Sequence, residues 1–505
     1  MNIGEALPRN AQHFPQKPAL VDSRRSVNFC DLHLRTNRLG NYLLKQGIVP
    51  GDIVGLSCGN RCEYFEILFA LAKIGAIAAP FDHNWSARES QAMISYFQPR
   101  AFCLDERKEN TAIANIVKNH LDLARVISID GPRDGSGRGY EEVLSSGDLS
   151  DPPIQVDGKD VFMIMITSGT TGFPKGCISS HEAYVMRSLN NAIAKSVDRD
   201  VRALITLPLQ FNAGRGTMIG ILYLGGTVFI HDRFDEESFL NTIEQERITY
   251  TMMVPTICDR LLRHNDLEKY RTTSLDYVGI TGGHLSREAA EGLMQKLNPN
   301  IYQAYASTDC GVISVLTPAE VAAHSDTVGR PIWCVLLRLE DENGNEVGLG
   351  EEGEICVRSP LSIQGYYRNS EATEEFFKGG WCHSGDIGYL DSEGYLRISG
   401  RKKSMIKSGG ISIFPEEIEE VLRGHPQVED AAVIGFSSPE WGEAVKALVI
   451  KKQGADCTAE TLIRYCKESL ASYKAPKAVE FVTGLPRTGL GKIDRGRLSS
   501  VLRSP

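Results

Sequence analysis

Residues 167–176 read Thr-Ser-Gly-Thr-Thr-Gly-Phe-Pro-Lys-Gly and follow an apolar run from Val161 to Ile166. An apolar strand that opens into hydroxyl and glycine residues presents N–H groups and hydroxyls to anionic oxygen. The stretch therefore predicts a loop that binds polyphosphate. It is not a Walker loop, because Pro174 precedes the lysine in place of glycine and Gly176 replaces the magnesium-binding hydroxyl. The alternative is an ordinary flexible loop, since Ser, Thr and Gly are common in loops.

Size and composition place the chain among large globular proteins. At 505 residues it is too long for one hydrophobic core and predicts two or more domains. The hydrophobic share of 42% and the charged share of 24% are ordinary. The net charge of −9 and the lack of a basic stripe interleaved with aromatics argue against a nucleic-acid partner. An anionic substrate must then be attracted by local cations.

The N-terminal segment and the cysteines bear on the compartment. Residues 1–5 include no basic segment followed by an apolar stretch, so we expect no signal peptide. The most apolar region, Phe65 to Pro80, is interrupted by Lys73 and is too short to span a bilayer. It predicts a buried helix and strand. Twelve cysteines without a C-x-x-C pair indicate reduced thiols in a cytoplasmic protein.

Between about residues 50 and 310, short apolar runs alternate with helix-like segments such as Tyr64–Lys73 and Met218–Tyr223. Strands are expected at 53–57, 76–80, 203–207, 227–230, 250–254, 277–280 and 301–305. This alternation favours parallel sheets covered by helices, and its two similar stretches hint at duplicated halves.

From about residue 328 the sequence changes to short strands and turns, with a turn at 341–345. Residues 348–353 match G-x-G-x-x-G, but a strand-like run follows instead of a helix. We therefore interpret this match as a hairpin loop and not as a dinucleotide site.

The last hundred residues have an α+β pattern. A helix is expected from Pro415 to Gly424 and another at 462–470, with strands at 431–436, 447–450 and 478–482. The predicted fold is α/β, with a large N-terminal domain (1–402) of mostly parallel sheets covered by helices plus a small β-rich subdomain. A small mobile α+β domain (403–505) follows it.

Four later motifs carry groups that suit a nucleotide. Residues 303–309 offer the Tyr305 ring, a hydroxyl and a carboxylate; residues 381–386 end in Asp386, apt for a ribose diol. Arg401 supplies a bidentate cation, and Lys492 lies on a glycine-bearing loop near the C-terminus. Each has an ordinary alternative: a core aromatic for Tyr305, a turn cap for Asp386, a surface ion pair for Arg401 and a solvated lysine for Lys492.

In this order and spacing, the five motifs resemble those of the adenylate-forming (AMP-binding) enzymes. That superfamily includes acyl-CoA synthetases, adenylation domains of peptide synthetases and firefly-type luciferases. The resemblance runs from about Ala19 to Arg497 and is closest to the carboxylate–CoA ligases. It implies that ATP activates a carboxylic acid as acyl-AMP with release of pyrophosphate, and that the acyl group then passes to the thiol of CoA. ATP, Mg²⁺ and CoA are the cofactors and co-substrates it implies.

The resemblance also implies roles for the matching residues. Lys492 reaches the carboxylate, Thr308 contacts the α-phosphate and Asp309 holds Mg²⁺. Nucleotide binding is implied for Thr167, Ser168, Gly169, Thr170, Thr171, Lys175, Gly282, Gly283, Tyr305, Asp386 and Arg401.

A hinge and a tunnel for CoA are implied as well. Lys403 occupies the family's hinge position, and rotation there would exchange Lys492 for the face that carries Lys407, Gly409 and Gly410. The two glycines suit the passage of a slender pantetheine arm. The alternative is that they only form a turn.

The acyl pocket is expected at Phe211, Asn212, Arg215, His284 and Ala306. The neutral Phe211-Asn212 pair argues against an amino-acid substrate, whose ammonium group needs an aspartate there. Arg215 has two open interpretations, a partner for a second carboxylate or polar substituent, and a structural arginine. The expected substrate is a small to medium aliphatic or aromatic acid.

The chain departs from the family's usual pattern in several places. Asp309 replaces glutamate, Phe211 stands where many acyl-CoA synthetases have histidine, and Ala306 stands where glycine is common. The segment from Thr281 to His284 is one residue shorter than its commonest version.

Three other functions compete with CoA ligation: an enzyme that loads a carrier protein, a luciferase-like oxygenase and a non-catalytic nucleotide-binding relative. Retention of Lys492, Asp386 and Arg401 argues against the last. We expect a monomer or homodimer.

Overall fold

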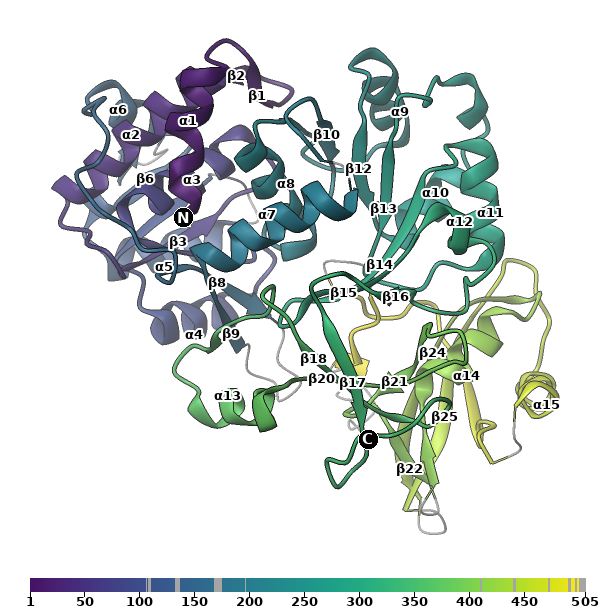
Figure 1. The fold of residues 1–505 in the computed structure, drawn as a ribbon. Helices are drawn as coiled ribbons and strands as arrows, with labels where there is room; N and C mark the ends of the chain where they lie inside the picture. The colour runs from purple at the N-terminus through teal and green to yellow at the C-terminus, as the bar shows by residue number, and fades with distance from the viewer. Residues whose placement is uncertain are drawn as a thin grey trace.

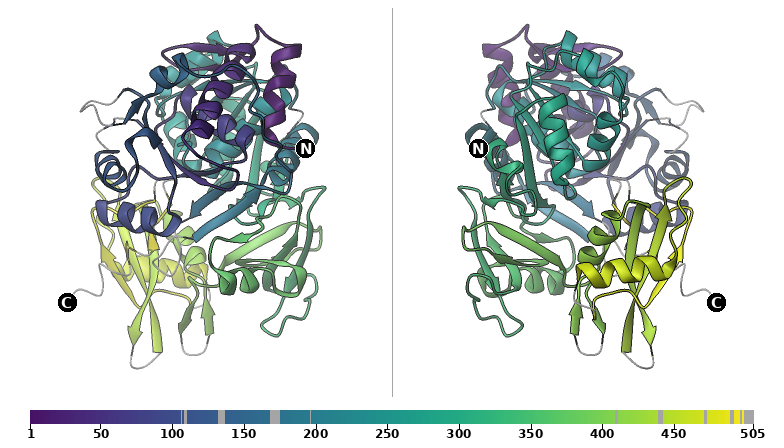
Figure 2. Two further views of the ribbon diagram at one scale, coloured as in Figure 1. Left: turned by 90° about the vertical axis from the view of Figure 1, so that its left-hand side faces the viewer. Right: turned by 90° about the vertical axis from the view of Figure 1, so that its right-hand side faces the viewer.

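The structure is a computed structural model of the chain. It describes residues 1–105, 107, 110–131, 137–167, 175–195, 197–408, 411–438, 442–470, 473–488, 492–495 and 497–498. Two large sheets lie side by side in the N-terminal part, and the C-terminal segment lies against one end of them (Figures 1 and 2).

The first large sheet has eight strands in the order β19-β9-β8-β4-β3-β5-β6-β7. Strands β3 to β8 pair in parallel, whereas β8 and β9 form an antiparallel pair. The strands are β3 (Ile53–Ser57), β4 (Ile77–Pro80), β5 (Ala101–Leu104), β6 (Val126–Ser128), β7 (Arg138–Gly139), β8 (Val161–Thr167), β9 (Lys175–Ser180) and β19 (Gly365–Tyr366).

The second large sheet has nine strands in the order β16-β15-β14-β13-β12-β10-β11-β1-β2. Its central strands, from β14 through β1, pair in parallel. The strands are β1 (Pro18–Val21), β2 (Ser26–Asn28), β10 (Arg202–Ile205), β11 (Thr227–Ile230), β12 (Tyr250–Met253), β13 (Tyr277–Ile280), β14 (Ile301–Ser307), β15 (Gly311–Leu316) and β16 (Arg330–Pro331). The predicted parallel sheets are therefore confirmed.

Helices join the two sheets through one hydrophobic core. Every residue of α3 (Cys62–Ile74) is buried, and its acidic residues Glu63 and Glu66 are paired with arginines. The other helices of this part are α1 (Ala6–His13), α2 (Phe29–Lys45), α4 (Ala87–Phe97), α5 (Thr111–His120), α6 (Tyr140–Ser145), α7 (His181–Lys195), α8 (Asn212–Leu224), α9 (Glu236–Gln245), α10 (Pro255–Leu262), α11 (Arg287–Lys296), α12 (Pro318–Val321) and α13 (Ser370–Phe376).

Helix α8 begins six residues earlier than the predicted helix at Met218. Gly214 and Gly216 weaken the helical signal there, because glycine is a poor helix former. The glycine at 214 is needed for close packing, since a Cβ atom on it would lie 2.7 Å from the Pro208 carbonyl oxygen. The expected pocket residues Asn212 and Arg215 thus lie on the first turns of a helix and not on a loop.

The small β-rich subdomain is an antiparallel sheet in the order β17-β18-β20-β21. Its strands are β17 (Leu336–Glu340), β18 (Gly353–Arg358), β20 (Cys382–Leu390) and β21 (Leu396–Arg401). The G-x-G-x-x-G match at 348–353 lies in the connection between β17 and β18, as the predicted hairpin requires.

The C-terminal segment has a hydrophobic core of its own, which includes Ile406, Ile418 and Val433. It contains β22 (Ile406–Ser408), β23 (Ile411–Ile413), α14 (Pro415–Arg423), β24 (Val428–Ser438), β25 (Gly442–Lys451), α15 (Ala459–Ser469) and β26 (Ala478–Phe481). The domain boundary at Lys403, between β21 and β22, stays a prediction. Among the described helices, none combines the length and apolar composition that crossing a bilayer requires.

Candidate active site between the N-terminal sheets and the C-terminal segment

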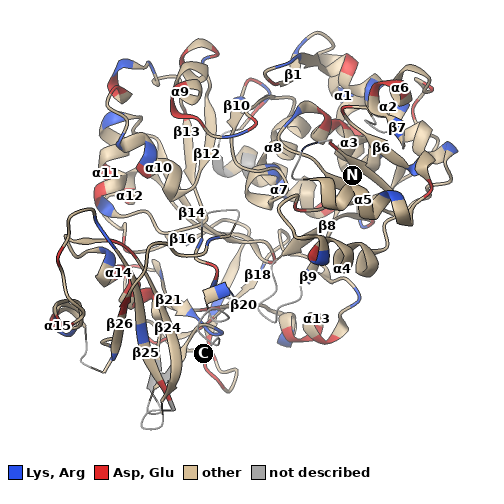
Figure 3. Cartoon of the chain, turned by 180° about the vertical axis from the view of Figure 1, so that it is seen from behind, with Lys and Arg blue, Asp and Glu red and all other residues tan. Residues whose placement is uncertain are grey.

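A cavity of about 3760 Å³ separates the N-terminal part from the C-terminal segment. Ordinary small-molecule sites measure roughly 300–1,000 Å³, so there is room for more than one substrate. Its walls include Thr308 and Asp309 after β14, Arg401 at the end of β21, and Lys492. In Figure 3, positive and negative residues are interspersed over both parts of the molecule. Local groups must therefore set the charge of the cavity.

Tyr305, Asp386 and Arg401 form one cluster beside this cavity, which Arg401 itself lines. The Tyr305 hydroxyl donates to Asp386 Oδ2 at 2.5 Å, and Arg401 Nε lies 2.9 Å from Oδ1. Asp386 and Arg401 are direct cross-strand partners on β20 and β21, and this register sets the ion pair. Burial and the Asp386 charge raise the pKa of Tyr305, and the same carboxylate raises the pKa of Arg401. The turn-cap alternative for Asp386 is wrong, because the residue lies within β20.

Asp309 lies in a second cluster at the end of the β8–β9 hairpin. The buried Cys177 thiol on β9 donates to Asp309 Oδ1 at 2.8 Å. The Lys175 ammonium lies 4.5 Å from the centre of the Tyr366 ring. Burial raises the pKa of Asp309, an effect that the thiol and the Lys175 and Arg401 charges oppose. A carboxylate at the cavity wall thus interacts electrostatically with two cations, Lys175 and Arg401.

Lys492 reaches this cavity from the C-terminal segment. A Cβ atom on Gly282 would lie 3.9 Å from Lys492 Cε, so the lysine stem passes over that glycine. Gly282 has a φ of +87°, which favours glycine at this position. Lys492 as a whole residue is exposed, yet burial of its ammonium and the nearby Arg401 charge lower its pKa. Lys492 is therefore held in the same space as the nucleotide-binding candidates.

The expected acyl-pocket residues lie along the same cavity. Phe211 is the N-cap of α8, Asn212 follows it, and Ala306 is on β14. Arg215 is fully buried on α8. His284 also lines the cavity, on the side of the C-terminal segment, where its Nε2 atom is 3.9 Å from Glu420 Oε1 on α14. A family model for the AMP-binding enzymes matches residues 7–367, and a model for their C-terminal domain matches residues 417–492.

This chain belongs to the AMP-binding enzyme family. A feruloyl-CoA synthase of Amycolatopsis sp. is 33% identical, with 98% of each chain covered. An indoleacetate–CoA ligase of Aromatoleum aromaticum is 32% identical, with 98% of this chain and 96% of that protein covered. The structure of o-succinylbenzoate CoA synthetase from Bacillus subtilis, in complex with an acyl-adenylate, matches with a TM-score of 0.87 at 27% identity, covering 98% and 97% of the two chains. The resemblance inferred from the motifs is confirmed.

Several residues matched to the AMP-binding enzymes lie where their contacts are not described. Ser168, Gly169, Thr170, Thr171, Gly409 and Gly410 fall outside the described residues. Lys407 is on β22, but its side chain is likewise outside the described part, and Lys403 is exposed between β21 and β22. Thr167, Gly283, Thr308, Asp309 and Arg401 line the cavity, whereas Tyr305 and Asp386 lie behind its wall in contact with each other and, through Asp386, with Arg401. The roles of these residues stay predictions.

Sequence reasoning missed Cys177, Tyr366, Tyr184 and Arg187, which lie at or beside the cavity. Cys177 could have been found from its position two residues after Lys175, which places both side chains on one face of a strand. No comparable local signal marks Tyr366, because it reaches the site from β19, far along the chain.

Proposed function

We propose that this member of the AMP-binding family is a carboxylate–CoA ligase. It converts a carboxylic acid and ATP to acyl-AMP and pyrophosphate, and then transfers the acyl group to CoA with release of AMP. The observation that carries the proposal is the presence of Lys492 in one cavity with Thr308, Asp309 and Arg401, whose guanidinium pairs with Asp386. The curated relatives named above, both CoA ligases, support the choice of acceptor.

The first step must bring an anionic carboxylate to an anionic α-phosphate. Fixed cations and donors at the place where charge builds up lower this barrier, and they act more strongly where water is excluded. Lys492 supplies a cation from the C-terminal side, while Arg401 supplies one from β21. The Thr308 hydroxyl lines the same space as a donor. Together they would hold the two anions in line.

The nucleotide would be held by Asp386, Tyr305 and Lys175. Asp386 keeps acceptor capacity beyond its two contacts and suits the hydroxyls of a ribose. Tyr305 would present its ring to the adenine while its hydroxyl fixes Asp386. Lys175, beside Asp309, would approach the outer phosphates.

The donor set at Asp309 fits Mg²⁺. Magnesium prefers oxygen ligands and is commonly bound by one or two carboxylates together with substrate phosphates. Asp309 offers one carboxylate at the cavity wall, and its contact with the Cys177 thiol leaves further lone pairs available. When bound there with ATP, Mg²⁺ would neutralise charge on the leaving pyrophosphate. Asp309 holds and orients the ion in this proposal.

The second step has the opposite demand, because a thiol must reach the carbonyl carbon that Lys492 approaches. Rotation of the C-terminal domain about Lys403 would withdraw Lys492 and bring Lys407 and the 409–410 segment toward the site. A few backbone dihedral angles are enough for such a hinge. Half-reaction assays, described below, test both the rotation and the Gly409-Gly410 tunnel. They also distinguish the tunnel from the alternative in which these glycines only form a turn.

The principal competitor is an enzyme of the same chemistry that loads a carrier protein; a luciferase-like oxygenase is the less favoured alternative. All twelve cysteines are free thiols, which supports a reducing compartment and hence our assignment to the cytoplasm. A monomer or homodimer is proposed, with no nucleic-acid partner.

The deciding experiment is AMP release from ATP across a panel of carboxylic acids, each with and without CoA. Turnover that depends on CoA is expected for at least one acid. Acyl-AMP that accumulates without CoA-dependent turnover would instead favour a carrier protein as acceptor. Oxygen consumption with light emission would favour the oxygenase.

Replacing Asp386 by asparagine is expected to raise the KM for ATP by roughly 10–100-fold, the scale of hydrogen bonds to a charged group. The kcat value should fall much less, because Asp386 is proposed to bind the ribose and not the reacting carboxylate or the α-phosphate. Steady-state kinetics with saturating acid measure both. The matched control is Asp326→Asn, which breaks the ion pair with Arg397 away from the cavity and should leave the KM unchanged. An unchanged KM in Asp386→Asn would contradict the ribose contact.

The rate of adenylation is expected to fall at a lower alkaline pH than it would if Lys492 had the usual pKa of a lysine. The pKa of Lys492 lies below its usual 10.5, so the ammonium is lost as pH rises through this lowered value. Pyrophosphate exchange measured against pH should show the falling limb. In Lys492→Arg the guanidinium stays charged, so the limb should move upward even if the rate is lower. If the falling limb stays at the same pH in Lys492→Arg, the loss of rate is caused by titration of a group other than Lys492.

A further inference from the structure

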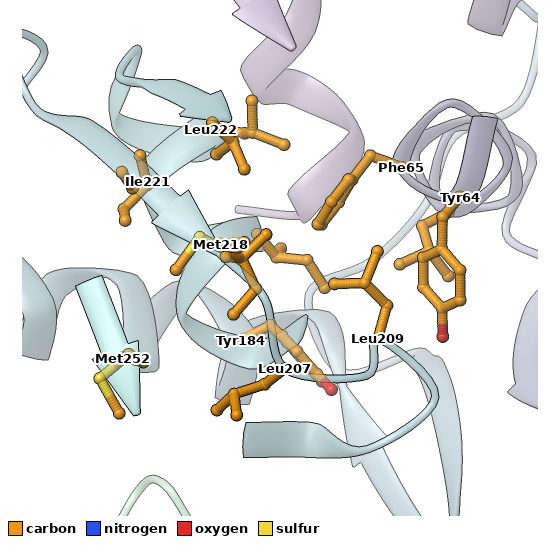
Figure 4. Close-up of a cluster of buried hydrophobic side chains, with 14 of the residues drawn as sticks. Tyr64, Phe65, Tyr184, Leu207, Leu209, Met218, Ile221, Leu222 and Met252 are labelled. Carbon is orange, nitrogen blue, oxygen red and sulfur yellow. The ribbon is translucent and has the colours of Figure 1, made fainter. Parts of the chain in front are cut away.

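Two buried arginines stand beside the expected acyl pocket. Arg187 on α7 is 9% exposed and Arg215 on α8 is 0% exposed, and both line the cavity. They share Tyr184 as a neighbour, since the Arg187 guanidinium lies 4.9 Å from the Tyr184 ring centre and Tyr184 interacts electrostatically with Arg215. Figure 4 shows Tyr184 and Tyr64 at the edge of an apolar cluster that includes Leu209 and Met218.

Arg215 uses only part of its guanidinium within the protein. Its Nη1 atom donates to the Tyr64 hydroxyl at 3.2 Å and to the carbonyl oxygens of Leu209 and Gln210 at 2.8 and 2.9 Å. Its Nε atom is buried and has no hydrogen-bond partner among the described residues. A buried donor without a partner is destabilising, because it has lost its hydrogen bonds to water. The position therefore retains donor capacity for a further group.

Arg187 is bound in the same incomplete way. Nε and Nη2 both donate to one oxygen, the Leu361 carbonyl, at 3.3 and 2.8 Å. The Nη1 atom donates to the Met165 sulfur at 4.0 Å, and a thioether is a weak acceptor. The fork of this guanidinium thus satisfies one carbonyl and leaves its third nitrogen poorly bonded.

Among the described residues, neither guanidinium group has a carboxylate partner. No ion pair of either residue occurs within the described part of the chain, and residues 168–174 contain no Asp or Glu. Other buried arginines differ: Arg61 pairs with both Glu63 and Asp130. Burial, and to a smaller extent the Arg215 charge, lower the pKa of Arg187, whereas the tyrosines Tyr64 and Tyr184 raise the pKa of Arg215. Buried charges are normally paired, because isolated ones cost several kcal/mol.

We propose that Arg187 and Arg215 bind a second carboxylate of the acid substrate, so that the enzyme takes a dicarboxylic acid. The inference rests on the proposed function and specifies its substrate class. The reacting carboxylate lies at Lys492 and Thr308, and the distal one lies between α7 and α8. The amide of Asn212, whose oxygen accepts from the Tyr184 hydroxyl at 3.4 Å, supplies further donors at the same place. Met252, Val254 and Ala213 on the cavity wall suit an apolar connecting segment.

The wild-type enzyme tests the proposal without any substitution. Each set contains three acids with the same carbon framework, which carry a distal carboxylate, a distal carboxamide or a distal methyl group. The sets cover aliphatic frameworks of different length and one aromatic framework. The kcat/KM for AMP release with CoA is expected to favour the best diacid over its half-amide by about 10–100-fold, the value of charge-assisted hydrogen bonds. A half-amide or methyl analogue that equals its diacid in every set would overturn the second-carboxylate site while leaving the ligase intact. Silence with all acids would contradict both proposals.

Substitution at Arg187 locates the preference. Arg187→Gln is expected to bring the diacid to half-amide ratio close to one, mainly through the KM of the diacid, and Arg187→Lys should restore part of the ratio. The matched control is Arg368→Gln, which removes an arginine that also lies over a tyrosine ring, Tyr367 at 5.1 Å, but outside the cavity. Because the readout is a ratio of two substrates, partial loss of folded enzyme does not change it. If the diacid to half-amide ratio is unchanged in both Arg187 variants, the arginine has only a structural role through its hydrogen bonds to the Leu361 carbonyl.

Discussion

Lys492→Ala is expected to slow adenylation by about 10²–10³-fold, the scale for removing one preorganised donor from a transition state. The stem of this lysine passes over Gly282 and its ammonium enters the cavity of Thr308 and Arg401. With the ammonium removed, the carboxylate and the α-phosphate would repel each other without that counter-charge. Pyrophosphate exchange, which reports the first step alone, measures the loss.

The selectivity of the effect is its decisive feature. Conversion of supplied acyl-AMP and CoA to thioester should stay nearly intact, because Lys492 is withdrawn in that step. Lys452→Ala, which removes an exposed lysine of the C-terminal segment away from the cavity, should affect neither step. Equal losses in both half-reactions would remove Lys492 from the adenylation role. Gly410→Leu should show the opposite selectivity if the 409–410 segment forms the thiol path.

Asp309→Asn is expected to reduce adenylation by about 10²–10³-fold, since a carboxylate at a metal-assisted site contributes several kcal/mol of charge stabilisation. Asparagine preserves the shape and the contact with Cys177 but loses the negative charge. The dependence of the rate on Mg²⁺ concentration should shift to higher concentrations in the variant. Initial rates over a magnesium titration provide this readout.

A conservative variant and a distant one control this result. Asp309→Glu restores the residue that the AMP-binding enzymes usually carry, and it should retain activity within roughly tenfold of wild type. Asp276→Asn changes an exposed aspartate outside the cavity and should leave the magnesium dependence unaltered. If Asp309→Asn kept the wild-type magnesium dependence, the ion would have to be held elsewhere.

Most of the fold could be predicted from the sequence, because strands and helices alternate clearly in the first 310 residues. The buried helix near Phe65 and the hairpin around 348–353 were found for the same reason: their local patterns agree with their environment. Helix α8 was shortened in the prediction because Gly214 and Gly216 are chosen for close packing. Tertiary contact overrides local propensity at such positions.

The residues of the candidate site could be predicted from the sequence only where they belong to contiguous motifs. Asp386 and Arg401 were assigned separately, and only the register of β20 and β21 shows that they form an ion pair. The contact of Cys177 with Asp309 joins residues 132 positions apart, so no local pattern contains it. Arg187 has the spacing of an ordinary helix residue. Its significance depends on burial and on the lack of a carboxylate partner within the described residues, which a sequence does not display.

The central claim, activation of an acid as its acyl-AMP, is tested most directly by isotope transfer. The acid is labelled with ¹⁸O in both carboxylate oxygens and converted with ATP and CoA, and the products are analysed by mass spectrometry. A mixed anhydride with AMP predicts that one ¹⁸O atom ends in the phosphate of AMP and the other in the thioester carbonyl. Label in phosphate or pyrophosphate, with none in AMP, would contradict the account.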